Sequence, residues 1–199
     1  MQPETFLTLL GLAFVASWTP GPNNSLLASS GATFGIRATL PMILGIITGY
    51  PVLITLVGLG LAEAFHQSPL FAAVLHWVGA GLLLWIAWKI ATSVAPDTTG
   101  KPGRPITYLQ SVTFQTVNPK GWAVAIAVTS QYVVGDNANM IAFIIGGAFF
   151  FAGLTSTFAW TLFGRAIGRL LQTPQRLMWF NRAMALLIVG FLIVLLMDS

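Results

Sequence analysis

Cysteine is absent from this chain, and potential metal ligands of other kinds are scarce: 199 residues include two histidines and five acidic residues. Without thiols, the chain forms no disulfide and offers no thiolate to a metal. Charged residues of all kinds make up only 7% of the sequence. A soluble domain carries about a quarter. The lack of charge therefore excludes an ordinary soluble domain, and the lack of ligands argues against an elaborate metal site.

Apolar residues, in contrast, are abundant. They make up 56% of the chain, and the mean hydropathy is +0.81. They form long continuous runs, which favour membrane-spanning helices over the alternating pattern of a β-barrel. We predict an all-α integral membrane protein with six transmembrane helices, at about residues 6–32, 38–61, 70–94, 111–134, 139–164 and 179–197. We expect one membrane domain over residues 1–199, without a soluble domain.

The first apolar run is interrupted by Thr19-Pro20-Gly21-Pro22-Asn23-Asn24. Two prolines around a glycine cannot continue an α-helix, because each proline lacks an amide donor and clashes with the preceding turn. Such a break survives in a membrane only inside the protein or beside a wet cavity. We expect Asn23, Asn24 and Ser25 to cap a second half-helix, whose amino terminus suits an anionic group. The alternatives are a kinked span or a tight loop between two spans.

The fourth run is interrupted at Asn118-Pro119-Lys120-Gly121. A shift of 97 positions places Pro22 on Pro119 and Asn23 on Lys120, so both breaks fall in the first span of a three-helix unit. An odd number of spans makes the second unit inverted relative to the first, as in many secondary transporters. We therefore predict two inverted three-helix repeats at about residues 1–95 and 106–199, joined by a loop at about 96–105, with spans one and four broken.

The basic residues indicate an orientation. In the six-span arrangement, eight of the nine fall on one side: Arg37, Lys89, Lys101, Arg104, Arg165, Arg169, Arg176 and Arg182. The opposite side carries Glu4, Glu63, Asp136 and Asp198 and no Lys or Arg. Positive loops are cytoplasmic, so both termini are predicted to be periplasmic. Because these residues flank apolar runs, we assign them to topology and lipid contact and expect no nucleic-acid partner.

The two broken segments resemble those of the LysE-type amino-acid exporter superfamily, in its homoserine/threonine-efflux branch. The similarity runs over nearly the whole chain and includes Gly31, Gly35, Gly45 and Gly49. Residues 85–93 and the Phe114-Gln115 pair look most like the cysteine/O-acetylserine exporters of that branch. The resemblance implies efflux of small amino acids or their derivatives across the bacterial inner membrane, powered by an ion gradient. It does not fix the substrate, because neighbouring branches share both motifs.

A transported amino acid needs donors for its carboxylate and acceptors for its ammonium. We expect the half-helix starts and Lys120 to bind the carboxylate, and asparagine oxygens and freed carbonyls to bind the ammonium. The candidate substrate-binding residues are Pro20, Gly21, Pro22, Asn23, Asn24, Gln115, Asn118, Pro119 and Lys120. Because no acidic residue lies in the middle of a span, Lys120 is also the candidate for carrying a coupling proton. The alternative is that Lys120 is a structural strut held by carbonyls. Tyr50 and Gln115 either line the transport cavity or are core residues whose polar groups are satisfied.

Other function classes fit less well. An ion or metal exporter or channel is the main alternative, but it needs acidic or thiolate ligands at depth. An enzyme needs a nucleophile and base or a metal cluster, and two distant histidines supply neither. We therefore expect no enzymatic activity and no cofactor. The expected partners are a small amino acid, a coupling ion that we take to be the proton, and membrane lipid; a homodimer is one option for assembly.

Overall fold

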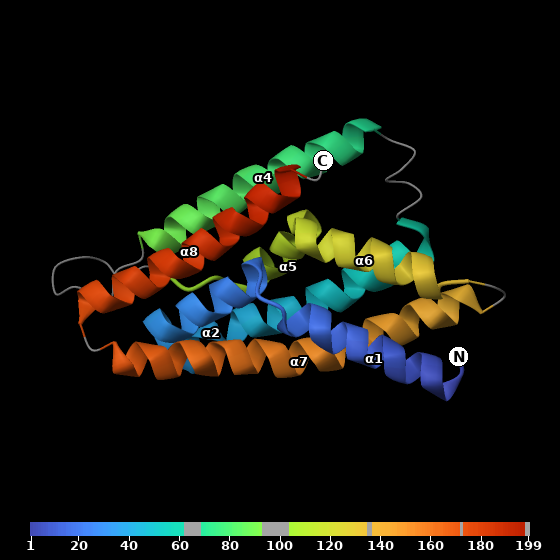
Figure 1. The fold of residues 1–199 in the computed structure, drawn as a ribbon, viewed down its shortest axis with the longest axis horizontal. Coiled ribbons are helices and arrows are strands. Elements are labelled where there is room, and N and C mark those ends of the chain that lie inside the picture. Colours follow the sequence, from blue (N-terminus) through green and yellow to red (C-terminus); the bar gives the residue numbers. More distant parts are fainter. Residues whose placement is uncertain (62–68, 93–103, 135–136, 172, 198–199) are drawn as a thin grey trace.

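The protein is described by a computed structural model, whose described residues are 1–61, 69–92, 104–134, 137–171 and 173–197. Within these ranges the chain forms helices and short connections (Figure 1). The elements are α1 (Pro3–Trp18), α2 (Pro22–Leu56), the π-helical turn η1 (Val57–Leu61), α4 (Pro69–Ala91), α5 (Tyr108–Val117), α6 (Pro119–Tyr132), α7 (Ala138–Leu170) and α8 (Pro174–Met197). Helix α4 packs against α8, and α1 packs against α7, on opposite sides of α2 and the α5–α6 pair (Figure 1).

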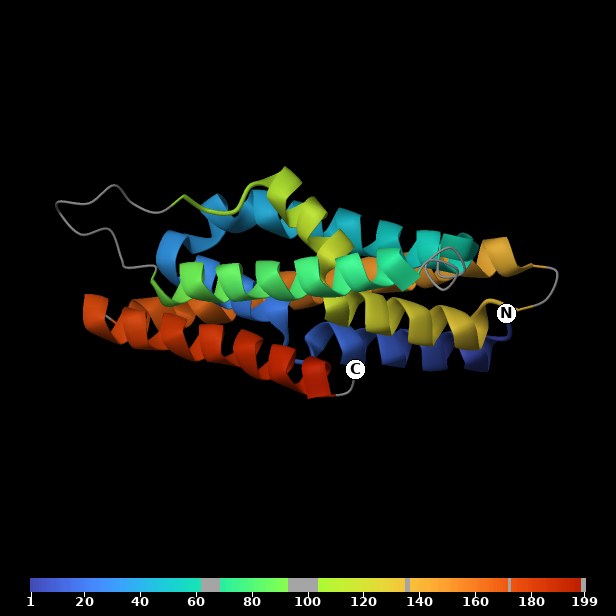
Figure 2. The ribbon, with the colours of Figure 1, turned by 90° about the horizontal axis from the view of Figure 1, so that it is seen from above.

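Helix α2 reverses direction at Gly35, whose φ of +78° and ψ of 176° lie outside the helical region. The hydroxyls of Ser30 and Thr39 lie 2.8 Å apart across this point. Nine residues of straight helix would separate them by about 13.5 Å. A positive φ is readily available only to glycine among the common residues, so Gly35 permits the reversal. The two halves of α2 thus run antiparallel, and the reversal falls between the first two predicted spans (Figure 2).

Both predicted helix breaks are present, and both half-helices begin with a proline. Pro22 opens α2 and Pro119 opens α6, where a missing amide hydrogen costs nothing. The predicted capping of α2 by Asn23, Asn24 and Ser25 is wrong. The N-cap is Gly21, and no side chain caps the helix. The two asparagine amides instead reach other segments of the chain, which are described with the site below.

Helix α5 begins by a different device. Thr107 accepts a hydrogen bond from the amide of Gln110, and the Gln110 side chain accepts one from the amide of Thr107. This reciprocal capping box satisfies two amides that the helix itself leaves unpaired. It fixes where α5 starts, one turn ahead of the buried Ser111 and two turns ahead of Gln115.

Two buried apolar clusters form the core, and the breaks lie between them. Leu9 and Ala13 of α1 belong to one cluster, whereas Leu26 and Leu27, after the first break, belong to the other. At the second break the order is opposite, because Phe114 lies in the cluster that holds Leu26 and Trp122 lies in the cluster that holds Leu9. The chain therefore crosses from one cluster to the other at each break, in opposite directions.

Three helices of the described residues are long and apolar enough to cross a membrane: Pro22–Gly60, Ala138–Leu170 and Pro174–Val194. The first, at 39 residues, includes the reversal at Gly35 and so passes along the bundle twice. Pro3–Trp18 and Ala80–Ala91 are shorter apolar helices. The fold is an all-helical one suited to a membrane. Six spans, and their arrangement as inverted repeats, remain predictions.

Several basic residues lie at one end of the helix bundle. The reversal of α2, the end of α4, the end of α7 and the beginning of α8 lie at one end of the bundle (Figures 1 and 2). Arg37 lies two residues after that reversal, and Lys89 lies in the last turn of α4. Arg169 lies in the last turn of α7, and Arg176 lies in the first turn of α8. The beginning of α1 and the end of α6 lie at the opposite end (Figure 1). Lys101, Glu63, Asp136 and Asp198 lie outside the described residues.

Candidate functional site

Lys120, in the first turn of α6, joins the two helix breaks. Its ammonium donates a hydrogen bond to the carbonyl oxygen of Thr19 at 2.7 Å, and the Pro20 carbonyl oxygen lies 3.4 Å away. Both carbonyls are freed by the interruption between α1 and α2. Lys120, from the second break, thus binds carbonyls of the first break. The side chain is half-buried, with Gly21 beside it.

Asn24 binds two carbonyls at the end of α1, one of which Lys120 also binds. Its side-chain amide donates to the carbonyl oxygens of Ser17, at 3.0 Å, and Thr19, at 2.9 Å. The Ser17 carbonyl also accepts from the hydroxyl of Ser156 on α7, at 2.7 Å. An unsatisfied carbonyl in a dry interior is costly, so these donors stabilise the broken helix end. Asn24 is therefore a donor to the backbone in this conformation.

Asn23 and Gln115 form a reciprocal amide pair between α2 and α5. Asn23 donates to Oε1 of Gln115 at 2.9 Å, and Gln115 donates to Oδ1 of Asn23 at 3.2 Å. Gln115 also donates to the carbonyl of Ser111 at 2.9 Å, and it is 1% exposed. This pair joins the two broken segments at a second point, 92 residues apart in sequence.

The second break leaves an acceptor free. Among the described residues, Oδ1 of Asn118 and the Ser17 hydroxyl are buried without a hydrogen-bond partner. By contrast, the Thr116 carbonyl is satisfied by the indole N–H of Trp122, at 2.8 Å. Buried polar atoms are nearly always paired, so the Asn118 oxygen and the Ser17 hydroxyl are candidates for contact with a ligand or water.

A small cavity of about 40 Å³ lies between the breaks. Its walls come from α1, both half-helix starts, Tyr50 and Ile46 of α2, and α7. Tyr50 packs edge-on against Phe149, with ring centroids 5.7 Å apart, and its ring closes over Gly121. This volume admits one water or a few, so an amino acid enters only if the breaks move apart. Lys120 is the sole ionisable side chain other than Tyr50 among the described residues of this wall.

The predicted site residues divide into two groups. The cavity wall includes Gly21, Asn23, Asn24, Asn118 and Lys120. Pro20, Pro22, Pro119 and Gln115 are not among the wall residues: the prolines shape the breaks, the Pro20 carbonyl accepts from Lys120, and Gln115 pairs with Asn23. Sequence reasoning missed Ser17, Ser156 and Thr157, which also line the cavity. Within the described residues, no three His, Asp or Glu side chains come together to hold a metal.

Comparison with known proteins identifies the family. The model of the LysE type translocator family matches residues 14–199. The chain belongs to the LysE-type translocator family. This confirms the resemblance carried by the two breaks, and the matched LysE region contains both of them. No solved structure matches the chain.

Curated relatives in the LysE family are similar over nearly their whole length. The cysteine/O-acetylserine efflux protein of Salmonella choleraesuis (strain SC-B67) is 31% identical over 194 residues, covering 95% of this chain and 96% of the relative. The cysteine/O-acetylserine efflux protein of Escherichia coli (strain K12) is 29% identical over 192 residues, with the same coverage.

Proposed function

We propose that this protein is a secondary active exporter of small neutral amino acids or their derivatives across the bacterial inner membrane, of the cysteine, O-acetylserine, threonine or homoserine type. One observation carries the proposal: a lysine from one helix break binds the freed carbonyls of the other, on a cavity whose described wall has no carboxylate. A lysine within an apolar span is costly and marks a functional site. The names of the relatives support the substrate class.

The substrate carboxylate takes the place of the Thr19 and Pro20 carbonyls at Lys120. A charge-assisted bond between ammonium and carboxylate is about twice as strong as a neutral one. The substrate ammonium is bound by Oδ1 of Asn118 and the Ser17 hydroxyl, which are buried on the same cavity without partners in the described structure. When Lys120 leaves the carbonyls, one of the two contacts between the breaks is released, the Asn23–Gln115 pair being the other, and the cavity can widen once both have parted.

The two broken segments act as equivalent parts of two inverted three-helix repeats, residues 1–95 and 106–199. In support, Gly146 of α7 lies against Pro51 and Thr55 in the second half of α2, and α4 packs against α8, so predicted spans two and five, and three and six, contact each other. The opposite crossing between the two core clusters at the two breaks also fits an inverted relation. Alternating access then consists of one unit rocking against the other around the site.

Export is coupled to protons, with Lys120 as the exchanging group. The described wall of the cavity offers no carboxylate for this role. The missing carboxylate also disfavours lysine and arginine as substrates, because their side-chain cation would lie unpaired at depth.

Efflux from loaded vesicles tests this function. Vesicles containing cysteine, O-acetylserine, threonine, homoserine or lysine are compared with and without a proton gradient. We expect efflux of one or more neutral amino acids, accelerated by the gradient, and counterflow that shows a carrier and not a channel. The proposal is wrong if lysine outcompetes cysteine and threonine at equal concentration, or if no amino acid is transported.

A further inference from the structure

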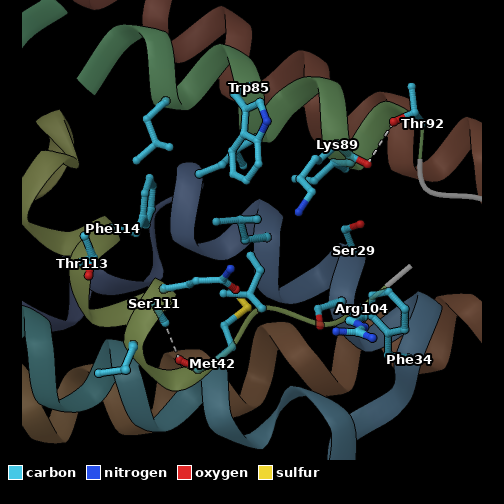
Figure 3. Close-up of a pocket in the computed structure, with 18 residues that line it drawn as sticks. Ser29, Phe34, Met42, Trp85, Lys89, Thr92, Arg104, Ser111, Thr113 and Phe114 are labelled. Atoms are coloured by element: carbon cyan, nitrogen blue, oxygen red, sulfur yellow. Dashed lines mark hydrogen bonds between the residues drawn. The ribbon is translucent and has the colours of Figure 1, made fainter. Parts of the chain in front are cut away.

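A second and much larger cavity, of about 590 Å³, lies between α2, α4 and α5 (Figure 3). Cavities of roughly 300–1,000 Å³ are typical of small-molecule sites. Its walls are mostly apolar, from residues such as Leu26, Met42, Ile86 and Phe114. No residue of the described wall is acidic. A much larger cavity therefore lies beside the small cavity between the helix breaks. One end of the large cavity differs chemically from a gap that is filled by lipid.

That end of the cavity carries two cations from different elements. Lys89 lies in the last turn of α4, and Arg104 lies four residues before α5. The Lys89 ammonium lies 4.5 Å from the ring centroid of Trp85, one turn away on the same helix face. In Figure 3 its nitrogen points into the cavity, with Arg104 and the Ser29 hydroxyl drawn at the same end. The arrangement suits an anionic group at the mouth of an apolar chamber.

The inner end of the cavity leads to the Asn23–Gln115 pair. Leu26 lines the cavity one turn after Asn23, and Ser111 lines it one turn before Gln115. The Ser111 carbonyl accepts a hydrogen bond from Gln115, which in turn pairs with Asn23 on the wall of the small cavity. The amide pair thus connects the wall of the large cavity, at Ser111, with the wall of the small cavity, at Asn23.

We propose that the large cavity is the chamber through which the substrate is loaded, and that Lys89 and Arg104 bind the carboxylate of an arriving amino acid. The inference rests on the proposed export function. The chamber lies at the basic end of the bundle, which is the predicted cytoplasmic side from which an exporter takes its substrate. Its apolar walls accept a short neutral side chain, and the missing acidic residue disfavours a cationic one. Passage to Lys120 then requires the Asn23–Gln115 pair to part.

The headgroup of an anionic phospholipid presents an anionic group, as the carboxylate of the substrate does, but the position of the cavity favours the amino acid. A lipid headgroup would explain why two cations, Lys89 and Arg104, lie at the mouth of the cavity. It would not explain why the inner wall of the cavity contacts the substrate site. The two sources differ in a measurable way. A substrate chamber changes the apparent affinity at one face of the membrane, whereas a lipid site changes the response to lipid composition.

The experiment measures initial transport rates of the amino acid that the parent protein transports fastest. Inside-out membrane vesicles report the KM at the cytoplasmic face, and right-side-out vesicles report the KM at the external face. The variants are Lys89→Gln, Arg104→Gln and the double variant. Arg176→Gln is the control, because Arg176 is an exposed cation at the same end of the bundle and does not line the cavity.

We expect each single variant to raise the cytoplasmic KM by about two- to fivefold, since exposed ion pairs are weak. The double variant should raise it further, with the maximal rate and the external KM unchanged. Arg176→Gln should match the parent. An unchanged cytoplasmic KM, or a rise confined to the external face, would overturn the inference while leaving export intact. Loss of the response to phosphatidylglycerol content with an unchanged KM would assign the cavity to lipid. A parent that transports no amino acid would overturn the export function itself.

Discussion

The ammonium of Lys120 and the carbonyl oxygen of Thr19 lie 2.7 Å apart, although 101 residues separate them in the sequence. This bond closes the cavity between the two broken helices. The ammonium that makes the bond can bind a carboxylate in place of the carbonyl. It makes the resting contact and the proposed substrate contact mutually exclusive. Lys120 is therefore both the binding group and the tie that substrate must release.

Replacing Lys120 separates a functional role from a structural one. Lys120→Met removes a buried charge, so the variant should insert and fold at least as well as the parent. It should lose tenfold or more of transport, which corresponds to a charge-assisted bond of about 1.5–3 kcal/mol. Lys120→Arg keeps the charge but cannot release its proton, and should bind weakly or lock one state. The measurements are counterflow and thermal stability in detergent.

Two outcomes contradict this account of Lys120. Parental efflux and affinity in Lys120→Met would remove the residue from the mechanism. Failure of Lys120→Met to accumulate in the membrane, with a lowered melting temperature, would make it a structural strut.

The Asn23–Gln115 pair should behave as one energetic unit. Asn23→Ala and Gln115→Ala each leave a partner unpaired, so the double variant should be more stable than the sum of the single effects predicts. Coupling between such side chains in membrane proteins averages about 0.6 kcal/mol and reaches about 1.7 kcal/mol. Asn23→Ala combined with Thr129→Ala is the control, because in the described part of the chain the Thr129 hydroxyl donates to carbonyls of its own helix. Additive effects in the Asn23–Gln115 cycle would show that the pair is not coupled.

The helix-breaking effect of proline predicted both breaks, and Lys120 was singled out because it lies directly after Pro119. Both predictions depend only on residues that are adjacent in the chain. The role of Asn24 was not predictable in the same way. Its sequence position suits a cap, but its side chain binds carbonyls at the end of α1. Ser156 reaches the Ser17 carbonyl across 139 residues. Capping rules describe neighbours along a helix, whereas these partners meet only once the helices pack.

We predict the orientation in the membrane from the basic end of the bundle. A reporter inserted between α7 and α8 should be cytoplasmic, because Arg169 and Arg176 flank this connection. A reporter at the carboxyl terminus should be periplasmic, since α8 runs away from the basic end (Figure 1). A cytoplasmic carboxyl terminus would be incompatible with six spans and with the inverted repeats that depend on them.

The packing of α2 on α7 should be intolerant of one added methyl group. A Cβ at Gly164 would collide with the carbonyl oxygen of Ala28, and main chain cannot move aside as a flexible side chain does. Gly164→Ala should therefore destabilise the protein by about 1–3 kcal/mol, as overpacking does. Gly147→Ala on the same helix has open space around the new Cβ and should be tolerated. Equal melting temperatures for the two variants would show that α2 and α7 are not packed this closely.

We expect Gly21 to be required because it leaves room for the Lys120 side chain, and not because the backbone conformation at this position needs a glycine. Its φ of −178° is an extended conformation that any residue adopts. A Cβ there would lie 2.8 Å from Cδ and 3.0 Å from Nζ of Lys120, so that side chain must leave the Thr19 carbonyl. Gly21→Ala should thus keep its melting temperature close to that of the parent and lose transport several-fold, with Gly11→Ala as a control whose added methyl meets nothing within 4 Å. Parental transport in Gly21→Ala would mean that the Lys120–Thr19 contact is dispensable. A fall in stability as large as that from a collapsed helix break would instead show that Lys120 holds the two breaks together for folding.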